Sequence, residues 1–176
     1  DGNGNFTNTG QSMGGVGVAL ADLDGDGDMD AFVGNGGANK VWLNDGSGNF
    51  TDSGQNLSSS DSYSVALGDL DGDGDLDAFV AIYSQANKVW LNDGSGNFTD
   101  SGQNLGSSYS RGVAFADLDG DGDMDAFVGN YNQPNKVWLN DGSGNFTDSG
   151  QNLGSSDSYS VALADLDGDG DMDAFV

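Results

Sequence analysis

The chain has 176 residues and a formal net charge of −25, from 29 acidic residues, all of them Asp, and 4 basic residues; it contains no Cys and no His. These absences exclude disulfide scaffolds, Cys/His zinc sites and catalysis that uses an imidazole base. Four basic residues are too few to hold a phosphate backbone, so we expect no nucleic-acid partner. No apolar run approaches the roughly 20 residues of a membrane-spanning helix, so we expect no membrane insertion.

The chain begins with a short Gly-rich segment, which we predict to be part of one repeat unit. Its string Asp-Gly-Asn-Gly-Asn-Phe-Thr starts at Asp1 and returns, with Ser in place of the first Asn, at Asp45, Asp93 and Asp141. The segment has neither an initiator Met nor the pattern of a signal peptide. We therefore expect the chain to be a processed product or an excerpt.

The next element is an acidic string, Asp-Leu-Asp-Gly-Asp-Gly-Asp-Met-Asp, in which Leu replaces Met once. It occurs four times at spacings of 47 or 48 residues and begins at Asp22, Asp69, Asp117 and Asp165. A third string, Asn-Lys-Val-Trp-Leu-Asn-Asp, begins at Asn39, Asn87 and Asn135. A fixed period of this length predicts a solenoid, a propeller or an array of modules.

Each period contains the pattern of four short strands. In the second period they cover residues 64–67, 78–80, 88–91 and 98–100, which are rich in Val, Phe and Trp and separated by Asn, Asp and Gly. Four strands in about 48 residues match one propeller blade, so we predict an all-β propeller of four-stranded blades. The alternative is a row of separate β modules, which at this size and without Cys would be marginally stable unless metal held them.

We assign residues 1–176 to a single repeat domain. Its units are a partial blade (1–11), three repeats (12–58, 59–106 and 107–154) and a partial repeat (155–176). The last unit stops after its second strand, and an incomplete blade exposes strand edges that tend to pair with another chain. We therefore expect either an excerpt of a longer propeller or self-association through the incomplete terminal blade.

The acidic strings have the composition of a calcium loop. Carboxylates occupy positions 1, 3, 5, 7 and 9, and Gly occupies position 6, where an EF-hand loop makes its sharp turn. A curled backbone can aim carboxylates 1, 3 and 5 at one point, with the carbonyl of position 7 and the carboxylate of position 9 completing the shell. Many hard oxygen ligands favour Ca²⁺ over transition metals and over Mg²⁺, so we predict about four Ca²⁺ per chain.

The alternative for the same strings is a solvated acidic turn, since Asp and Gly both favour turns. Against it stands the charge density, because five Asp side chains fall within nine residues and repel one another unless a cation compensates them. The arrangement recurs four times, which favours the metal interpretation.

The loop pattern Asp-x-Asp-Gly-Asp-Gly-x-x-Asp between two strands, repeated at blade spacing, resembles the FG-GAP/VCBS repeats of calcium-binding β-propellers, which include the heads of integrin α subunits. The resemblance implies side-chain ligands at positions 1, 3, 5 and 9 and a backbone carbonyl ligand at position 7. The implied metal ligands are Asp22, Asp24, Asp26, Asp28 and Asp30; Asp69, Asp71, Asp73, Asp75 and Asp77; Asp117, Asp119, Asp121, Asp123 and Asp125; and Asp165, Asp167, Asp169, Asp171 and Asp173. The chain lacks a Phe-Gly and Gly-Ala-Pro signature, so it is more similar to the VCBS type.

The connections on the face opposite the acidic loops carry most of the differences between repeats. Aromatic and amide side chains there suit stacking on sugars or contact with a protein. The candidate ligand-binding residues are Tyr83, Gln85, Tyr131 and Gln133. The alternative is ordinary loop variation in which the tyrosines pack on their neighbours.

Together these patterns predict a secreted protein, extracellular or at the cell surface, that acts as a structural or adhesion module with Ca²⁺ stabilising each blade. Two alternatives remain: a lectin-like propeller that binds carbohydrate through its variable face, and a subunit of an extracellular fibre. The expected partner is a glycan or a protein. We expect no enzymatic activity, because the clustered Asp residues are assigned to metal and no separate carboxylate pair stands outside the repeat.

Overall fold

The computed structural model describes residues 3–57 and 61–176, which form fourteen β-strands and no helix. The first sheet contains β1 (Gly17–Ala21), β2 (Asp30–Gly34), β3 (Lys40–Asn44) and β4 (Phe50–Asp52). The second contains β5 (Ser62–Gly68), β6 (Asp77–Ile82), β7 (Lys88–Asn92) and β8 (Phe98–Asp100). The third contains β9 (Ser110–Ala116), β10 (Asp125–Asn130), β11 (Lys136–Asn140) and β12 (Phe146–Asp148). The strands β13 (Ala162–Ala164) and β14 (Asp173–Phe175) form a two-stranded sheet.

Each four-stranded sheet is an antiparallel meander whose strand order follows the chain. The register is the same in every repeat, because the Ala after the acidic loop always pairs with the Trp of the third strand, as in Ala31 with Trp42 and Ala78 with Trp90. The predicted all-β repeat of four-stranded units is therefore confirmed.

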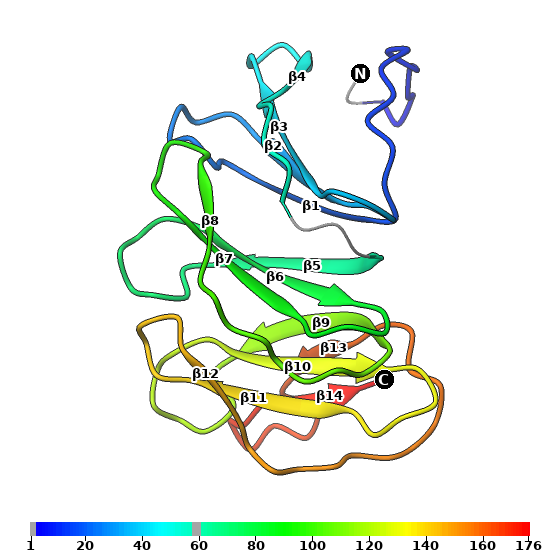
Figure 1. The fold of residues 1–176 in the computed structure, drawn as a ribbon, viewed down its shortest axis with the longest axis vertical. Helices are drawn as coiled ribbons and strands as arrows, with labels where there is room; N and C mark the ends of the chain where they lie inside the picture. Colours follow the sequence, from blue (N-terminus) through cyan, green and yellow to red (C-terminus); the bar gives the residue numbers. More distant parts are fainter. Residues whose placement is uncertain (1–2, 58–60) are drawn as a thin grey trace.

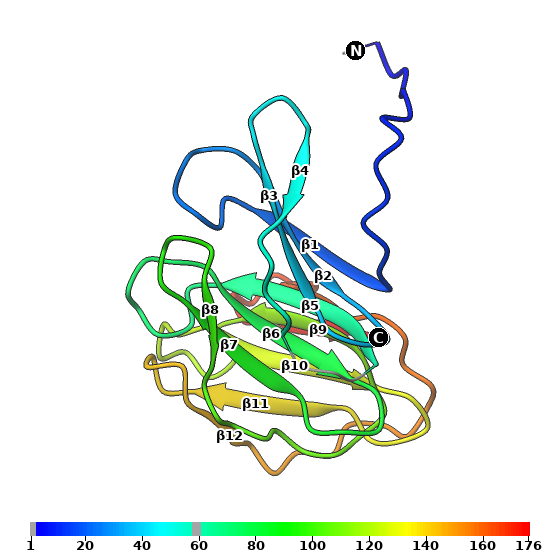
Figure 2. The same cartoon turned by 45° about the horizontal axis from the view of Figure 1, so that its top comes forward.

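The three four-stranded sheets follow one another along the long axis of the molecule, and β13 and β14 lie behind the third sheet in this view (Figure 1). The first strands β1, β5 and β9 contact one another in that order, and β13 contacts β9. The first described residues lie beside the first sheet, and the chain ends at β14, beside the third sheet (Figures 1 and 2). Within residues 3–57 and 61–176 no sheet closes a ring, so the propeller ring stays a prediction. The predicted boundary between residues 58 and 59 lies outside the described residues, and the other unit boundaries stay predictions too.

The core lies between successive sheets. Phe98 of the second sheet meets Phe32 of the first edge to face, with ring centroids 5.2 Å apart, and Phe146 of the third meets Phe79 of the second in the same way at 5.6 Å. Trp90 is buried in the same interface as Phe32 and Phe98. Burying one such side chain contributes about 1.5–3 kcal/mol, so the junctions between sheets, rather than the sheets alone, hold the fold together.

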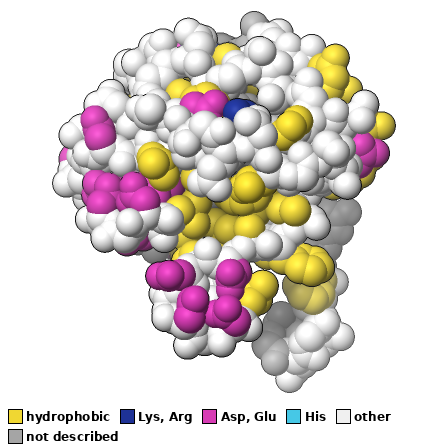
Figure 3. All heavy atoms as spheres, turned by 90° about the horizontal axis from the view of Figure 1, so that it is seen from below, with side chains coloured by type: hydrophobic (Ala, Val, Ile, Leu, Met, Phe, Trp, Pro, Cys, Tyr) yellow, Lys and Arg dark blue, Asp and Glu magenta, His cyan; other side chains and the backbone are white. Residues whose placement is uncertain are grey.

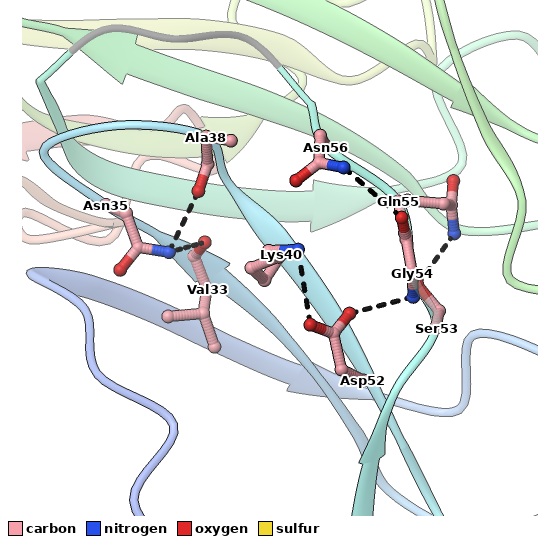
Figure 4. Close-up of polar contacts among 9 residues, drawn as sticks. All are labelled: Val33, Asn35, Ala38, Lys40, Asp52, Ser53, Gly54, Gln55 and Asn56. Atoms are coloured by element: carbon pink, nitrogen blue, oxygen red, sulfur yellow. Dashed lines mark hydrogen bonds and ion pairs between the residues drawn. The ribbon is translucent and has the colours of Figure 1, made fainter.

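A lysine and an aspartate pair across the outer two strands of each complete sheet. In the first sheet Lys40 Nζ lies 3.2 Å from Asp52 Oδ2, and the Gly54 N–H donates to Asp52 Oδ1 at 2.8 Å (Figure 4). The Gly54 hydrogen bond first, and Lys40 second, lower the pKa of Asp52. The same ion pair joins Lys88 to Asp100 and Lys136 to Asp148. All three lysines of the chain are thus engaged away from the acidic loops.

Candidate metal centre

Each acidic loop gathers three of its five carboxylates. One oxygen from each of positions 1, 3 and 9 lies within 4.8 Å of the other two in all four loops. The triads are Asp22, Asp24 and Asp30; Asp69, Asp71 and Asp77; Asp117, Asp119 and Asp125; and Asp165, Asp167 and Asp173. Two oxygens on opposite sides of a bound Ca²⁺ are about 5 Å apart, because Ca–O distances are about 2.3–2.6 Å. The triads therefore have the right size for this ion.

The curl of the loop comes from local hydrogen bonds and two glycines. Asp22 accepts hydrogen bonds from the N–H groups of Gly25 at 2.8 Å and Gly27 at 3.0 Å, and Asp24 accepts one from Asp26 at 3.3 Å. Gly25 and Gly27 have φ values of 79° and 94°, in the left-handed region where a side chain is strained. The other three loops repeat this pattern, which is why the sharp turn could be predicted from the position of Gly.

The carboxylate at position 9 is held by a neighbouring strand as well as by the loop. Asp77 is fully buried; its Oδ2 accepts the Leu70 N–H at 3.0 Å and its Oδ1 accepts the Asn92 N–H at 2.8 Å. Each carboxylate oxygen has two lone pairs, so an oxygen that accepts one N–H can still bind a cation. Asp30 and Asp125 are held in the same way, so the fold fixes one carboxylate of the triad in each of the first three loops.

The raised pKa values of several loop carboxyls show that these groups lack a compensating positive charge. Burial raises the pKa of Asp77 to about 6, against the hydrogen bonds from Asn92 and Leu70, and the neighbouring charges of Asp71 and Asp73 raise it further. Burial is also the first cause of the raised pKa of Asp71 and of Asp24. A carboxyl whose pKa rises in the folded state is ionised at a cost, which a bound cation would offset.

The chain supplies no such cation itself. Its three lysines pair with strand Asp residues, and Arg111, its one arginine, lies among tyrosine rings. Among the described residues no ion pair joins a basic side chain to an acidic loop. Any cation that compensates these carboxylates therefore comes from outside the chain, and an all-oxygen donor set suits a hard divalent ion.

The next sheet covers each interior loop, through contacts that sequence reasoning missed. Asn92 Nδ2 donates to the Leu23 carbonyl of the preceding loop at 2.9 Å, and Asn140 Nδ2 donates to Leu70 in the same way at 2.9 Å. These Asn residues end the repeated string Asn-Lys-Val-Trp-Leu-Asn. Their recurrence at the same place in each repeat was the one feature of the sequence that could have indicated this contact. A single loop therefore depends on two consecutive repeats.

Positions 5 and 7 of the loops lie outside the triads. Asp26 Oδ1 accepts the Asp28 N–H at 2.9 Å, and the Asp28 carboxylate lies against Gly46 of the Gly-rich turn, where a Cβ would collide with it. This contact places the acidic loop and the Gly-rich turn at the same end of the sheet. The ligand roles of all five positions stay predictions.

The tyrosines of the opposite face gather around Arg111. Its guanidinium lies 4.0 Å from the ring centroid of Tyr63, 4.8 Å from that of Tyr83 and 5.4 Å from that of Tyr131. Tyr83 also stacks on Tyr109, with centroids 4.7 Å apart. The ring centroid of Tyr159 lies 5.5 Å from the same guanidinium, so the cluster joins the units 59–106, 107–154 and 155–176. Each cation–π contact contributes about 0.5–2 kcal/mol.

The two candidate glutamines on this face have different positions. Gln133 Oε1 accepts the Tyr109 N–H at 2.9 Å, so this side chain supports the tyrosine cluster, whereas Gln85 is exposed. The structure therefore brings Tyr83, Tyr131 and Gln133 to one cluster. Their assignment to a ligand stays a prediction.

Comparison with known proteins places the chain in a family. A family model described as an FG-GAP-like repeat matches residues 22–80, 69–128 and 117–176, which together span most of the chain. The chain belongs to the FG-GAP-like repeat family. Each match begins at an acidic loop, and the predicted resemblance is thereby confirmed.

A likeness in fold comes from a solved structure. The crystal structure of the computationally designed Ika4 protein is similar with a TM-score of 0.56 and 16% sequence identity, over 96% of this chain and 94% of that chain. At this identity the likeness concerns the fold alone. No curated protein matches the chain. No helix among the described residues has the length and apolar character needed to cross a membrane.

Proposed function

We propose that this FG-GAP chain is a calcium-stabilised extracellular propeller module with a structural or adhesion role and no catalytic one. The observation that carries the proposal is the set of four carboxylate triads, three of which contain a fully buried Asp. None of them has a basic side chain as a partner in the described part of the chain. A divalent cation in each loop supplies the missing charge and fastens the loop to the strands around it.

Calcium is favoured over other ions by the ligands. The side chains that converge are all carboxylates, and carbonyl groups of the curled loop are the next oxygen donors in reach. Ca²⁺ takes 6–8 such oxygens, whereas Mg²⁺ keeps several waters and transition metals prefer nitrogen or sulfur. When bound, the ion would supply positive charge to the triad; the Asp residues would hold it and the Asn and Leu N–H groups would orient the position-9 carboxylate.

The extracellular location follows from the ion and the family. FG-GAP repeats are typical of extracellular proteins, and extracellular modules bind Ca²⁺ with dissociation constants of about 10⁻⁴–10⁻³ M. Binding of this strength, at free Ca²⁺ of 100 times the dissociation constant, contributes about 2.7 kcal/mol per site. Four sites of this strength are a large part of the stability of a small β domain.

Calorimetric titration of the chelated protein with Ca²⁺ tests the proposal. We expect about four ions per chain, a rise in the unfolding temperature with Ca²⁺, and a weaker response to Mg²⁺. Asp71→Asn should remove one ion, whereas the matched control Asp61→Asn, which changes the same charge outside the loops, should remove none. An unfolding temperature indifferent to chelator and Ca²⁺ would contradict the proposal.

The lectin-like alternative rests on the tyrosine cluster. Tyr159 is 60% exposed and Tyr131 partly exposed, so two aromatic rings remain available to a sugar. A glycan array probed with the wild type and with Tyr131→Ala tests this alternative. Binding that Tyr131→Ala abolishes, with an unchanged Ca²⁺ response, would assign the ligand to this face.

A further inference from the structure

A glutamine clamp joins three of the repeat units to the unit that follows. Gln55 Nε2 donates to the Gly96 carbonyl at 2.7 Å, and Gln55 Oε1 accepts the Phe98 N–H at 2.8 Å. Gln103 makes the same pair of hydrogen bonds to Gly144 and Phe146, at 2.6 and 2.8 Å. The clamp holds the Gly-Asn-Phe segment of the following unit and so seats its Phe in the core.

The third clamp is made by Gln11, which precedes the first sheet. Gln11 Nε2 donates to the Gly48 carbonyl at 2.7 Å, and Gln11 Oε1 accepts the Phe50 N–H at 2.8 Å. The chain contains four such glutamines and four Gly-Asn-Phe segments, and three of each are paired. One glutamine, Gln151, and one segment, residues 4–6, remain, and they lie at opposite ends of the stack.

Gln151 and Phe6, which take part in no clamp, are both exposed to solvent. Phe6 is 99% exposed, whereas its equivalents Phe98 and Phe146 are each 7% exposed. The Gln151 side chain is exposed and has no hydrogen bond to any described residue, whereas Gln103 is partly buried in its clamp. The same sequence is thus buried inside the stack and open at its two ends.

An apolar hollow lies beside Gln151. Figure 3 shows hydrophobic side chains gathered in a hollow on the side of the molecule where the last sheets lie, flanked by Asp residues. A cavity of about 230 Å³ there is lined by Gln151 and by Leu118, Phe127, Val137, Leu139 and Met172, among others. Four of these are the repeat equivalents of Leu70, Phe79, Val89 and Leu91, which lie in or against the core cluster that holds Phe146. The hollow is therefore built to take a Phe from a Gly-Asn-Phe segment.

The outer sheets show the same complementarity. Val18 on the first sheet is 63% exposed and Phe175 on the last is 74% exposed. Their equivalents at the internal junction, Val65 and Phe79, are 9% and 0% exposed. Each end of the stack therefore presents a face that is covered wherever two repeats meet.

We propose that the hollow at Gln151 binds residues 3–11 of a second copy of this chain, so that copies assemble head to tail. Phe6 of the second copy fills the hollow, Gln151 clamps its Gly-Asn-Phe segment, and the first sheet of that copy covers the last sheet of the first. The two surfaces differ, so the contact is heterologous and repeats from copy to copy until a ring closes or a filament grows.

The test is the oligomeric state by sedimentation and light scattering in Ca²⁺, up to the highest soluble concentration. The wild type should associate, and Phe6→Ala or Gln151→Ala should each raise the concentration needed by roughly tenfold or more. Matched controls are Thr7→Ala and Asn152→Ala, because the equivalents of both residues are exposed at every internal junction. These controls should associate like the wild type.

Mixing the two variants makes the test sharper. Phe6→Ala keeps an intact hollow, and Gln151→Ala keeps an intact N-terminal segment. In an equimolar mixture the hollow of the first variant can bind the segment of the second, but no further copy can join. At a concentration where the wild type associates and each variant alone is monomeric, the mixture should form dimers that grow no further. A monomeric wild type, or assembly that Phe6→Ala leaves unchanged, would overturn the proposal. Circular dichroism of each variant shows that the fold persists, and the Ca²⁺ titration is a separate readout.

Discussion

The acidic loops 69–77 and 165–173 differ by one residue in sequence but lie in different surroundings. Asp77 is fully buried and accepts hydrogen bonds from Leu70 and Asn92, whereas Asp173 is partly exposed and accepts one, from Leu166 at 3.0 Å. Leu70 is 0% exposed and Leu166 62%. The local curl of the loop is the same in both, so the comparison separates what the nine residues do from what the neighbouring strands add.

The largest expected effect comes from removing position 9 in each loop. In saturating Ca²⁺ we expect Asp77→Ala to cost roughly 3–5 kcal/mol, because it removes a metal ligand and leaves two buried N–H groups without an acceptor. Asp173→Ala should cost roughly 1–3 kcal/mol less, since its surroundings are open to water. Urea unfolding measures both. Equal losses would mean that burial of the loop adds nothing to its site.

The pH dependence of the metal-free protein probes the same contrast. The pKa of Asp77 rises from 3.8 to about 6 on folding, so the folded state binds this proton more readily than the unfolded state. In chelator, stability should therefore increase as pH falls from above 6 towards 4, by at most about 3 kcal/mol for this group. Asp77→Asn should flatten the dependence. Asp173→Asn serves as the control, and a flattening of the same size there would contradict the comparison.

A smaller effect is expected at the Asn that covers the loop. Asn92 Nδ2 donates to Leu23 of the preceding sheet, whereas the equivalent Asn44 donates only within its own sheet, to Met29 at 3.1 Å. Asn92→Ala should cost about 1–2 kcal/mol and Asn44→Ala less than about 1 kcal/mol, because only the first leaves a buried carbonyl with one partner fewer. Thermal unfolding in Ca²⁺ distinguishes them. A larger loss of stability for Asn44→Ala than for Asn92→Ala would contradict this expectation.

The smallest effect is expected far from either loop. Lys88→Met keeps most of the side-chain stem but removes the 3.2 Å ion pair with Asp100, which is partly exposed. Such pairs contribute about 0.2–1 kcal/mol, less at high salt. Urea unfolding at low and high salt measures this contribution. A loss as large as that of Asn92→Ala would show that the outer strands, rather than the loops, carry the stability.

Much of the fold followed from the repeated strings. Strands, turns and the position of the triads depend on residues close in sequence: the string Lys-Val-Trp-Leu-Asn extends because β-branched and aromatic residues favour strands, and Gly27 turns because it has no side chain. Of the site, the carboxylates of positions 1, 3 and 9 come together in every loop, whereas that of position 5, which was expected beside them, lies outside the triads. The roles of positions 5 and 7 and of the tyrosine face were predicted from the same strings and stay predictions.

The sequence by itself therefore determined the repeat, the all-β units and the acidic loops, since hydrogen bonds over two to seven residues shape them. Only the tertiary structure decided which carboxylates are buried, that Asn92 and Asn140 cover the preceding loops, and that Gln55 and Gln103 clamp the following units. Those contacts join residues about 40 to 70 positions apart. Identical strings have identical local preferences, so only the presence or absence of a neighbouring sheet can make them differ.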